Sequence, residues 1–191
     1  MKSHTTLIKT SVLAAALIAA SAGAQAEQRP VQSRLFLGTN SLDSDWGVHD
    51  EQGVFGVITD IKANNWPVAI AADVFGAGNE HKRGGNKSEA YVASAHLGLR
   101  LKCDDQSSWL RPYVGAGIAL AEAETKPNTD NDGGIGYWVG IGADIPLGER
   151  LSIGADLRYW DVDVEVSNAA LEASSLNAGG SQFGLTLGYS W

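Results

Sequence analysis

The sequence of 191 residues has one cysteine, one methionine and few charged side chains, which make up 19% of it. One cysteine excludes a disulfide framework and a cysteine-based zinc site. Lys and Arg number 14 against 22 Asp and Glu, so the formal charge is −8. This acidity argues against nucleic acid as a partner, because phosphate binding needs clustered basic residues. The length indicates one domain, and the composition suits either a soluble β domain or a membrane barrel.

The chain also lacks an apolar run of the ~20 residues that a membrane-spanning helix needs. At its N-terminus, Lys2 and Lys9 precede a short apolar run at residues 11–20. After the run, Ala24-Gln25-Ala26 offers a small-x-small cleavage site. This layout is typical of a secretory signal peptide. We therefore expect residues 1–26 to be a signal peptide cleaved near Ala26, and residues 27–191 to form the exported domain. If that domain spans a membrane, it does so with strands.

Alternation of apolar residues with small or polar ones marks eight segments of the exported chain. The clearest segment ends the chain, where every second residue is apolar or aromatic: Phe183, Leu185, Leu187, Tyr189 and Trp191. The same period occurs over residues 68–75, 91–102, 110–120, 136–145 and 151–160, and less regularly over 32–38 and 53–62. A period of two indicates β-strands with one apolar and one polar face.

The connections between these segments alternate in length. Short turns are expected near residues 63–66, 103–108 and 146–150, and long polar loops near 39–52, 77–87, 122–134 and 167–179. Outer-membrane barrels have this layout, with long loops outside and short turns in the periplasm. An even number of strands places both chain ends on the periplasmic side.

Charge separates the two faces of these strands. The apolar face is nearly free of charge along five consecutive strands, whereas the other face carries Asp, Arg, His and many Gly. A narrow eight-stranded lumen needs small side chains, so we assign the apolar face to lipid and the other to the lumen. A soluble β-sandwich or barrel, apolar inside and charged outside, is the alternative. The predicted fold is all-β: an eight-stranded antiparallel up-and-down transmembrane β-barrel.

One strand carries a family resemblance. Residues 109–118, WLRPYVGAGI, are similar to the Arg-Pro-Tyr-Val-Gly-x-Gly strand of the small outer-membrane barrels of Gram-negative bacteria, the OmpA/OmpX/OmpW-like porin-family barrels. The resemblance covers about residues 32–191. It implies export by the Sec route to the bacterial outer membrane, contact with outer-membrane lipid and lipopolysaccharide, and a monomeric state.

The same resemblance gives the terminal strand a role. In such proteins the C-terminal aromatic strand is read by the barrel-assembly machinery. The residues that would form this assembly signal are Phe183, Leu185, Leu187, Tyr189 and Trp191. The chain ends in Trp where many relatives end in Phe, so the aromatic end is kept.

The face assignment predicts a set of charged side chains inside the lumen. They are Arg34, Asp60, Asp73, His96, Arg100, Arg111, Asp156 and Arg158, with Lys102 and Asp144 near the periplasmic mouth. Isolated charges in so confined a space are costly, so they should pair. Two interpretations remain open: a salt-bridge plug that fills the barrel, and a gated polar path for small solutes.

The sequence offers little for catalysis, metals or cofactors. No nucleophile–base–orienter set emerges from the spacing, so we expect no catalytic residues and no cofactor. The alternative is a lipid A-modifying outer-membrane enzyme, an acyl hydrolase or acyltransferase, with loop residues such as His49, His81 and Ser88; no His-x-Ser-Asn signature supports it. Residues 128–133 resemble the start of a calcium loop, but Val139 stands where a ligating Glu is needed.

We therefore expect a non-enzymatic outer-membrane protein with a structural or surface-interaction role. Limited passage of small solutes through the charged lumen is a further option.

Overall fold

The computed structural model describes residues 31–42, 51–62, 66–83, 86–103, 108–126, 132–166, 174–177 and 179–191. The expected signal peptide, residues 1–26, lies outside this part of the chain. Within the described residues, no helix is long and apolar enough to cross a membrane.

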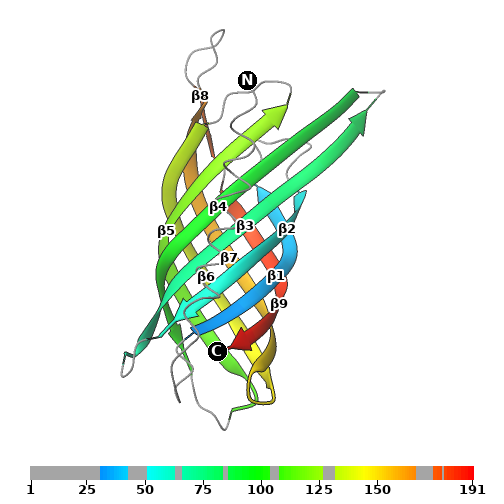
Figure 1. Ribbon diagram of the computed structural model, residues 1–191. Helices are drawn as coiled ribbons and strands as arrows, with labels where there is room; N and C mark the ends of the chain where they lie inside the picture. The colour runs from blue at the N-terminus through cyan, green and yellow to red at the C-terminus, as the bar shows by residue number, and fades with distance from the viewer. Residues whose placement is uncertain are drawn as a thin grey trace.

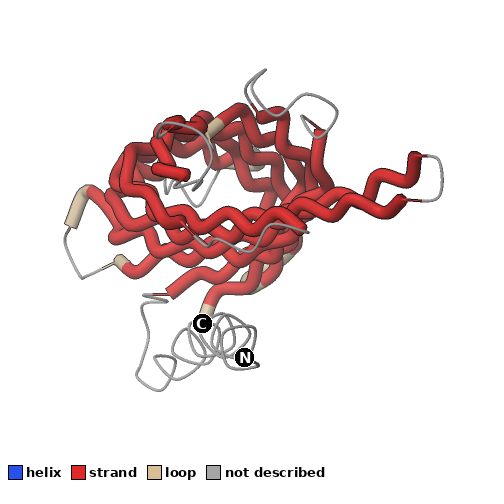
Figure 2. Tube along the Cα trace, turned by 90° about the horizontal axis from the view of Figure 1, so that it is seen from above, coloured by secondary structure: helices blue, strands red, loops and turns tan. Residues whose placement is uncertain are grey.

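The described residues form one closed antiparallel sheet (Figures 1 and 2). Its strands are β1 Val31–Leu42, β2 Glu51–Ile61, β3 Val68–Arg83, β4 Asn86–Lys102, β5 Arg111–Lys126, β6 Asp132–Leu147, β7 Leu151–Val166, β8 Ser174–Asn177 and β9 Gly180–Ser190. Neighbours in sequence pair from β1 to β7, and β9 closes the ring by pairing with both β1 and β7. The short β8 pairs with β7 beyond the outer end of β9, so β8 and β9 together occupy the place of the eighth strand. The predicted eight-stranded antiparallel barrel is confirmed.

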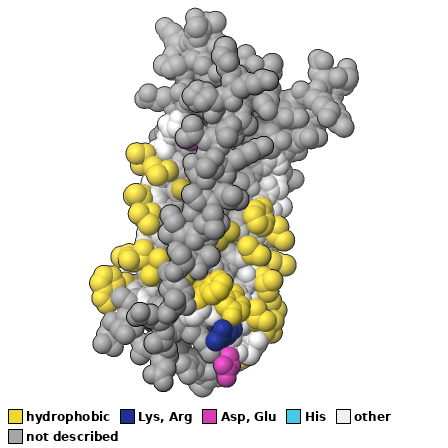
Figure 3. Space-filling model, viewed as in Figure 1, with side chains coloured by type: hydrophobic (Ala, Val, Ile, Leu, Met, Phe, Trp, Pro, Cys, Tyr) yellow, Lys and Arg dark blue, Asp and Glu magenta, His cyan; other side chains and the backbone are white. Residues whose placement is uncertain are grey.

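The period of two sends the apolar residues outward. On β1, Leu35 and Leu37 are 49% and 65% exposed, while Arg34 and Phe36, which alternate with them, are fully buried. Cross-strand partners share a face, so the outward apolar residues of adjacent strands join into a continuous band. Figure 3 shows apolar side chains on both flanks of the visible wall, and a basic and an acidic side chain next to each other near the lower end.

The strands extend further than the sequence pattern indicates, and this corrects the predicted loops. Of the loop expected at residues 77–87, only 84–85 lies between β3 and β4. Strands β5 and β6 also enter the loop expected at 122–134, and β8 lies within that expected at 167–179. Outside a membrane the backbone ladder continues with polar side chains on both faces, so the period is lost while the strand persists. The β3–β4 hairpin rises beyond its neighbours in Figure 1.

The opposite end of the barrel, which we call the short-turn rim, joins the two ends of the described chain. The backbone N–H of Trp191 donates to the carbonyl of Val31 at 2.9 Å, and that of Ser190 donates to Arg150 at 2.8 Å. Strands β6 and β7 are joined at this rim by a three-residue turn in which Gly148 has a φ of 88°. A positive φ of this size favours glycine, so Gly148 lets the chain form this tight turn without backbone strain.

Candidate functional site

The lumen nearer the short-turn rim contains a set of paired charges, which we call the ionic layer. It consists of four cations and four carboxylates: Arg34, Arg100, Lys102, Arg158, Asp60, Asp73, Asp144 and Asp156. Six strands supply them, since the period of two points one charged residue or two from each of β1, β2, β3, β4, β6 and β7 inward. Lys102 is 10% exposed at its side chain and the others are 3% or less.

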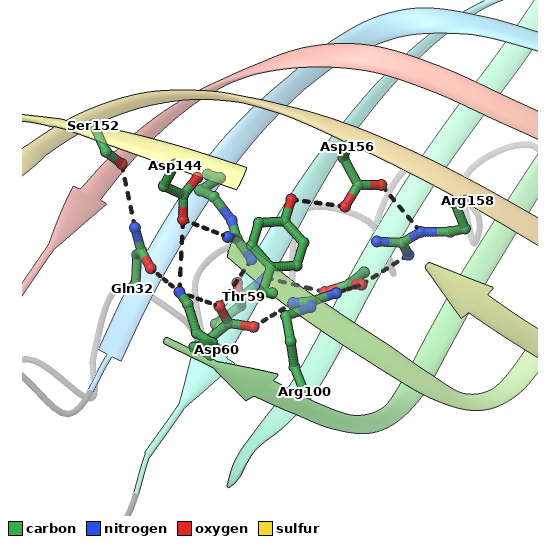
Figure 4. A network of polar contacts seen from close by, with 12 residues as sticks. Gln32, Thr59, Asp60, Arg100, Asp144, Ser152, Asp156 and Arg158 are labelled. Atoms are coloured by element: carbon green, nitrogen blue, oxygen red, sulfur yellow. Dashed lines mark hydrogen bonds and ion pairs between the residues drawn. The ribbon is translucent and has the colours of Figure 1, made fainter. Parts of the chain in front are cut away.

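Asp60 is the most connected carboxylate of the ionic layer. It accepts from Arg34 and Lys102 at 2.8 Å each, and it also pairs with Arg100 (Figure 4). Arg34 spans to a second carboxylate, because its other terminal nitrogen lies 2.8 Å from Asp144 Oδ2. One guanidinium therefore ties β1 to β2 and, across the lumen, to β6.

Asp73 holds the part of the layer nearer the barrel centre. Its Oδ2 accepts from Arg100 at 2.7 Å and from Arg158 at 2.8 Å, and its Oδ1 accepts from the backbone N–H of Thr59 at 3.2 Å. Arg158 also lies 3.4 Å from Asp156. Both carboxylate oxygens of Asp73 accept from buried donors, which fixes the carboxylate in place.

Tyr113 on β5 is an uncharged member of the same site. It is not among the lumen residues predicted from the sequence. Its hydroxyl donates to Asp156 at 2.8 Å, and its ring lies 4.5 Å from the guanidinium carbon of Arg34. Arg100 faces the same ring at 5.4 Å. The alternation along β5 predicts that Tyr113 faces the lumen. Because Tyr113 carries no charge, the charge pattern does not predict that it belongs to this site.

Arg111 stands apart from the ionic layer. It lies on the inward register of β5, opposite Asp144, and is half-buried at the short-turn rim. Among the described residues it forms no ion pair. Without Arg111, the ionic layer contains equal numbers of cations and carboxylates.

Above the ionic layer, toward the long loops, the lumen is filled by apolar side chains. We call this set the aromatic layer: Phe36, Phe75, Trp138, Trp160 and Ile58, each 3% exposed or less. Phe36 and Phe75 meet edge to face at 5.5 Å. In the sequence, the period of two already places Phe75, Trp138 and Trp160 on this face, but the predicted lumen residues are only its charged ones.

His96 lies where the two layers meet. Its ring stacks on Trp138 at 5.9 Å and is 5.2 Å from Phe75, while its Nδ1 lies 2.9 Å from a terminal nitrogen of Arg158. Because a guanidinium only donates, Nδ1 accepts and the ring proton is on Nε2. The Arg158 guanidinium also lies over Phe75 and Trp138, at 4.6 Å from each ring. Cation–π contacts thus join the charged and aromatic layers.

The described residues contain no group of three or more His, Cys, Asp or Glu that could hold a metal ion. His49 and most of residues 128–133 lie outside the described chain, and the side chains of His81 and Ser88 are likewise not described. In the lumen, each carboxylate of the ionic layer is bound to a cation, which suits structural pairing rather than proton transfer.

The terminal strand places its aromatic residues on the outer wall. Phe183, Leu185 and Leu187 are each more than half exposed, and the rings of Tyr189 and Trp191 meet edge to face at 4.8 Å. This surface faces away from the lumen residues.

Comparison with known proteins identifies the family. The family model described as outer membrane protein beta-barrel domain matches residues 10–190. No curated protein sequence matches the chain. Among solved structures, Neisserial surface protein A (NspA) has a TM-score of 0.60 at 17% identity, covering 84% of this chain and 96% of its own. OprG from Pseudomonas aeruginosa also has a TM-score of 0.60 at 17% identity, with 84% and 95% covered.

A third similar structure is Ail, the attachment invasion locus protein of Yersinia pestis, in complex with the heparin analogue sucrose octasulfate. Its TM-score is 0.54 at 11% identity, covering 84% of this chain and 96% of its own. At such identities these structures support the fold alone. The family match over nearly the whole sequence shows that the chain belongs to the outer-membrane β-barrel family.

Proposed function

We propose that this protein is a non-enzymatic outer-membrane barrel with a closed lumen and a structural or surface-interaction role. The observation that carries the proposal is the filling of the lumen by two successive layers. Ion pairs cross the lumen in the first, and buried aromatic rings occupy the second. Of the two interpretations that the sequence left open, the contacts favour the plug.

A solute path would require both layers to rearrange together. Separating Arg34 from Asp144 leaves charges without partners in a confined space, at a cost of several kcal/mol for each broken pair. A path would also have to cross the aromatic layer, and apolar constrictions resist the entry of water and ions. Because Arg158 contacts both layers, movement in one disturbs the other.

A closed barrel suits a protein that acts through its outer rim. Strands β3 and β4 stay paired as far as Arg83 and Asn86, whereas β2 pairs with β3 only as far as Gly78. The hairpin therefore extends an ordered backbone past the neighbouring wall. Two proteins of similar fold are described as a surface protein and an attachment protein, which accords with this role.

The partners in this proposal are those expected of an outer-membrane barrel. Lipid and lipopolysaccharide surround the wall, and the barrel-assembly machinery reads Phe183, Leu185, Leu187, Tyr189 and Trp191 during insertion. The chain acts as a monomer. The alternative of a lipid A-modifying enzyme receives no support from the family match or from the described side chains.

Liposome swelling tests the closed lumen with neutral solutes. We expect vesicles containing the refolded protein to take up arabinose no faster than empty vesicles, while a general porin refolded in the same way gives rapid uptake. Uptake that rises with protein content would contradict the proposal. For the non-enzymatic role, mass spectrometry of lipid A from cells with and without the protein should give identical acyl patterns, and a changed pattern would establish an enzyme.

A further inference from the structure

An apolar groove of about 460 Å³ crosses the outer wall of the barrel, from β3 to β7. Its lining contains no charged side chain: Val68, Leu99, Leu101, Val114, Gly115, Ala116, Val139, Gly140, Ile141, Leu157 and Tyr159. Most of these side chains point away from the lumen, so the groove opens to the surroundings of the barrel and not to its interior.

The strand register explains the shape of this groove. Val68, Leu101, Val114, Ile141 and Leu157 are successive cross-strand partners and form one row. Leu99, Ala116, Val139 and Tyr159 form the next row in the same way. Leu, Ile, Val and Tyr side chains make up both rows, except that Ala116 contributes only a methyl group near the middle. Gly115 and Gly140 are cross-strand partners between the two rows, at positions that face the lumen, so the floor between the rows is backbone.

The groove starts at the short-turn rim. Val68 is the first residue of β3, and Leu101 is the second-last of β4. Trp66 and Trp109, in the two connections that bracket these strands, are 51% and 73% exposed. Tryptophan is enriched at the level of lipid headgroups, and short turns of outer-membrane barrels lie in the periplasm. The groove therefore runs obliquely from the periplasmic headgroup level toward the middle of the membrane.

We propose that this groove binds one acyl chain of a phospholipid from the periplasmic leaflet. The groove is continuous with the lipid-facing band, is lined by apolar side chains and carries no charge, and a flexible hydrocarbon chain matches these properties. A chain lying across Ala116 contacts the backbone there and the larger apolar side chains around it, so it gains more dispersion contacts than on a smooth wall. A second protein copy is less suited, because a stable interface buries about 1,200–2,000 Å². The inference does not depend on whether the lumen is closed.

Photo-crosslinking in vesicles tests the proposal. The probe is phosphatidylethanolamine with a diazirine in the middle of one acyl chain, and peptide mass spectrometry locates the products. We expect labelling concentrated on groove residues such as Leu99 and Val139, well above Leu37 and Leu185 on the opposite wall, which are more exposed. Labelling that merely follows exposure around the barrel would overturn the proposal.

A matched pair of substitutions isolates the groove from general lipid contact. Ala116→Leu fills the groove floor, whereas Ala95→Leu adds the same side chain to an outward position on β4 that does not line the groove. We expect Ala116→Leu to lower groove labelling about tenfold. This is the effect expected when roughly two methylene groups of the bound acyl chain lose their contacts with the groove. Ala95→Leu should leave it unchanged, and heat-modifiable gel mobility confirms that both variants fold. Equal labelling in both variants would contradict the assignment.

Native mass spectrometry of protein released from the same vesicles distinguishes the occupants. One retained phospholipid per chain, reduced by Ala116→Leu, supports the proposal. A dimer that Ala116→Leu disrupts would assign the groove to a second copy and overturn it, as would retained lipid A in place of phospholipid.

Discussion

At the residue scale, the lumen is organised by pairs that bridge distant parts of the chain. Arg34 and Asp144 are separated by 110 positions and lie on strands that are not adjacent, yet they meet at 2.8 Å. Arg100 bridges Asp60 and Asp73 from a third strand. Burial makes each of these groups dependent on its partners, because a charge that loses its partner there also lacks water.

Removal of Arg100 should destabilise the barrel strongly. Arg100→Ala leaves Asp60 and Asp73 each short of one cation, so we expect the free energy of unfolding to fall by about 3–5 kcal/mol. Urea unfolding in lipid vesicles, followed by tryptophan fluorescence, measures it. The matched control is Arg111→Ala, which removes a half-buried arginine without an ion pair among the described residues and should change stability by about 0.5 kcal/mol or less. Equal losses in the two variants would refute the ionic layer.

The coupling between Arg100 and Asp73 gives a second residue-scale prediction. Asp73→Asn should lower the free energy of unfolding less in the Arg100→Ala background than in the wild-type protein. In that background Arg100 is already absent, so removing the charge of Asp73 breaks one ion pair fewer. We expect a coupling energy of about 0.5–3 kcal/mol from the double-mutant cycle, measured by the same unfolding assay. Additive effects would indicate that the two side chains act separately.

The faces of these residues are predictable from sequence, but their partners are not. The period of two along β1 and β4 places Arg34 and Arg100 inside. Which carboxylate each one meets depends on the register and stagger of the closed barrel, which no single strand specifies. The aromatic layer was not predicted for a different reason: Trp138 alternates with glycines along its face of β6, and small residues there indicate an open lumen more than a filled one.

At the element scale, two neighbouring strands approach closely at a pair of glycines. Gly98 on β4 faces Gly117 on β5, and a Cβ on Gly98 would lie 2.2 Å from the carbonyl oxygen of Ala116. A Cβ on Gly117 would lie 2.1 Å from the carbonyl oxygen of Leu97. Both obstacles are backbone atoms, so the strands must separate before either position accepts a side chain.

Gly98→Ala should therefore weaken the β4–β5 pairing. We expect a loss of about 1–3 kcal/mol, the usual cost of overpacking, seen as a lower urea midpoint and faster amide exchange in both strands. Gly76→Ala on β3 is the control, because a Cβ there meets nothing within 4 Å. If Gly76→Ala is as destabilising as Gly98→Ala, the close approach does not determine the cost.

The number and order of the spanning strands follow from the sequence, but their outer ends do not. Alternation locates β3 from Val68 onward because its outward residues must be apolar there. Beyond Ala77 that requirement ends, and residues that resemble a polar loop continue the ladder to Arg83. The backbone pairing continues through this part of the hairpin, and backbone pairing requires no side-chain period.

At the scale of the whole molecule, the barrel reverses the usual distribution of polarity: ion pairs inside, hydrocarbon side chains outside. A charge on the outer wall should therefore be costly in a depth-dependent way. Leu185→Arg, near the middle of β9, should lose about 2–4 kcal/mol of stability in vesicles. Leu147→Arg, at the short-turn rim, should lose about 0–1 kcal/mol. Similar losses at both depths would place the membrane band elsewhere.

The central claim is that the two layers close the lumen, and planar-bilayer recording of the refolded protein tests it most directly. Each insertion should leave the membrane without discrete current steps, while a general porin handled in the same way gives them. Steps of reproducible size that change with Arg100→Ala would show that ions cross the ionic layer, and would contradict the closed barrel.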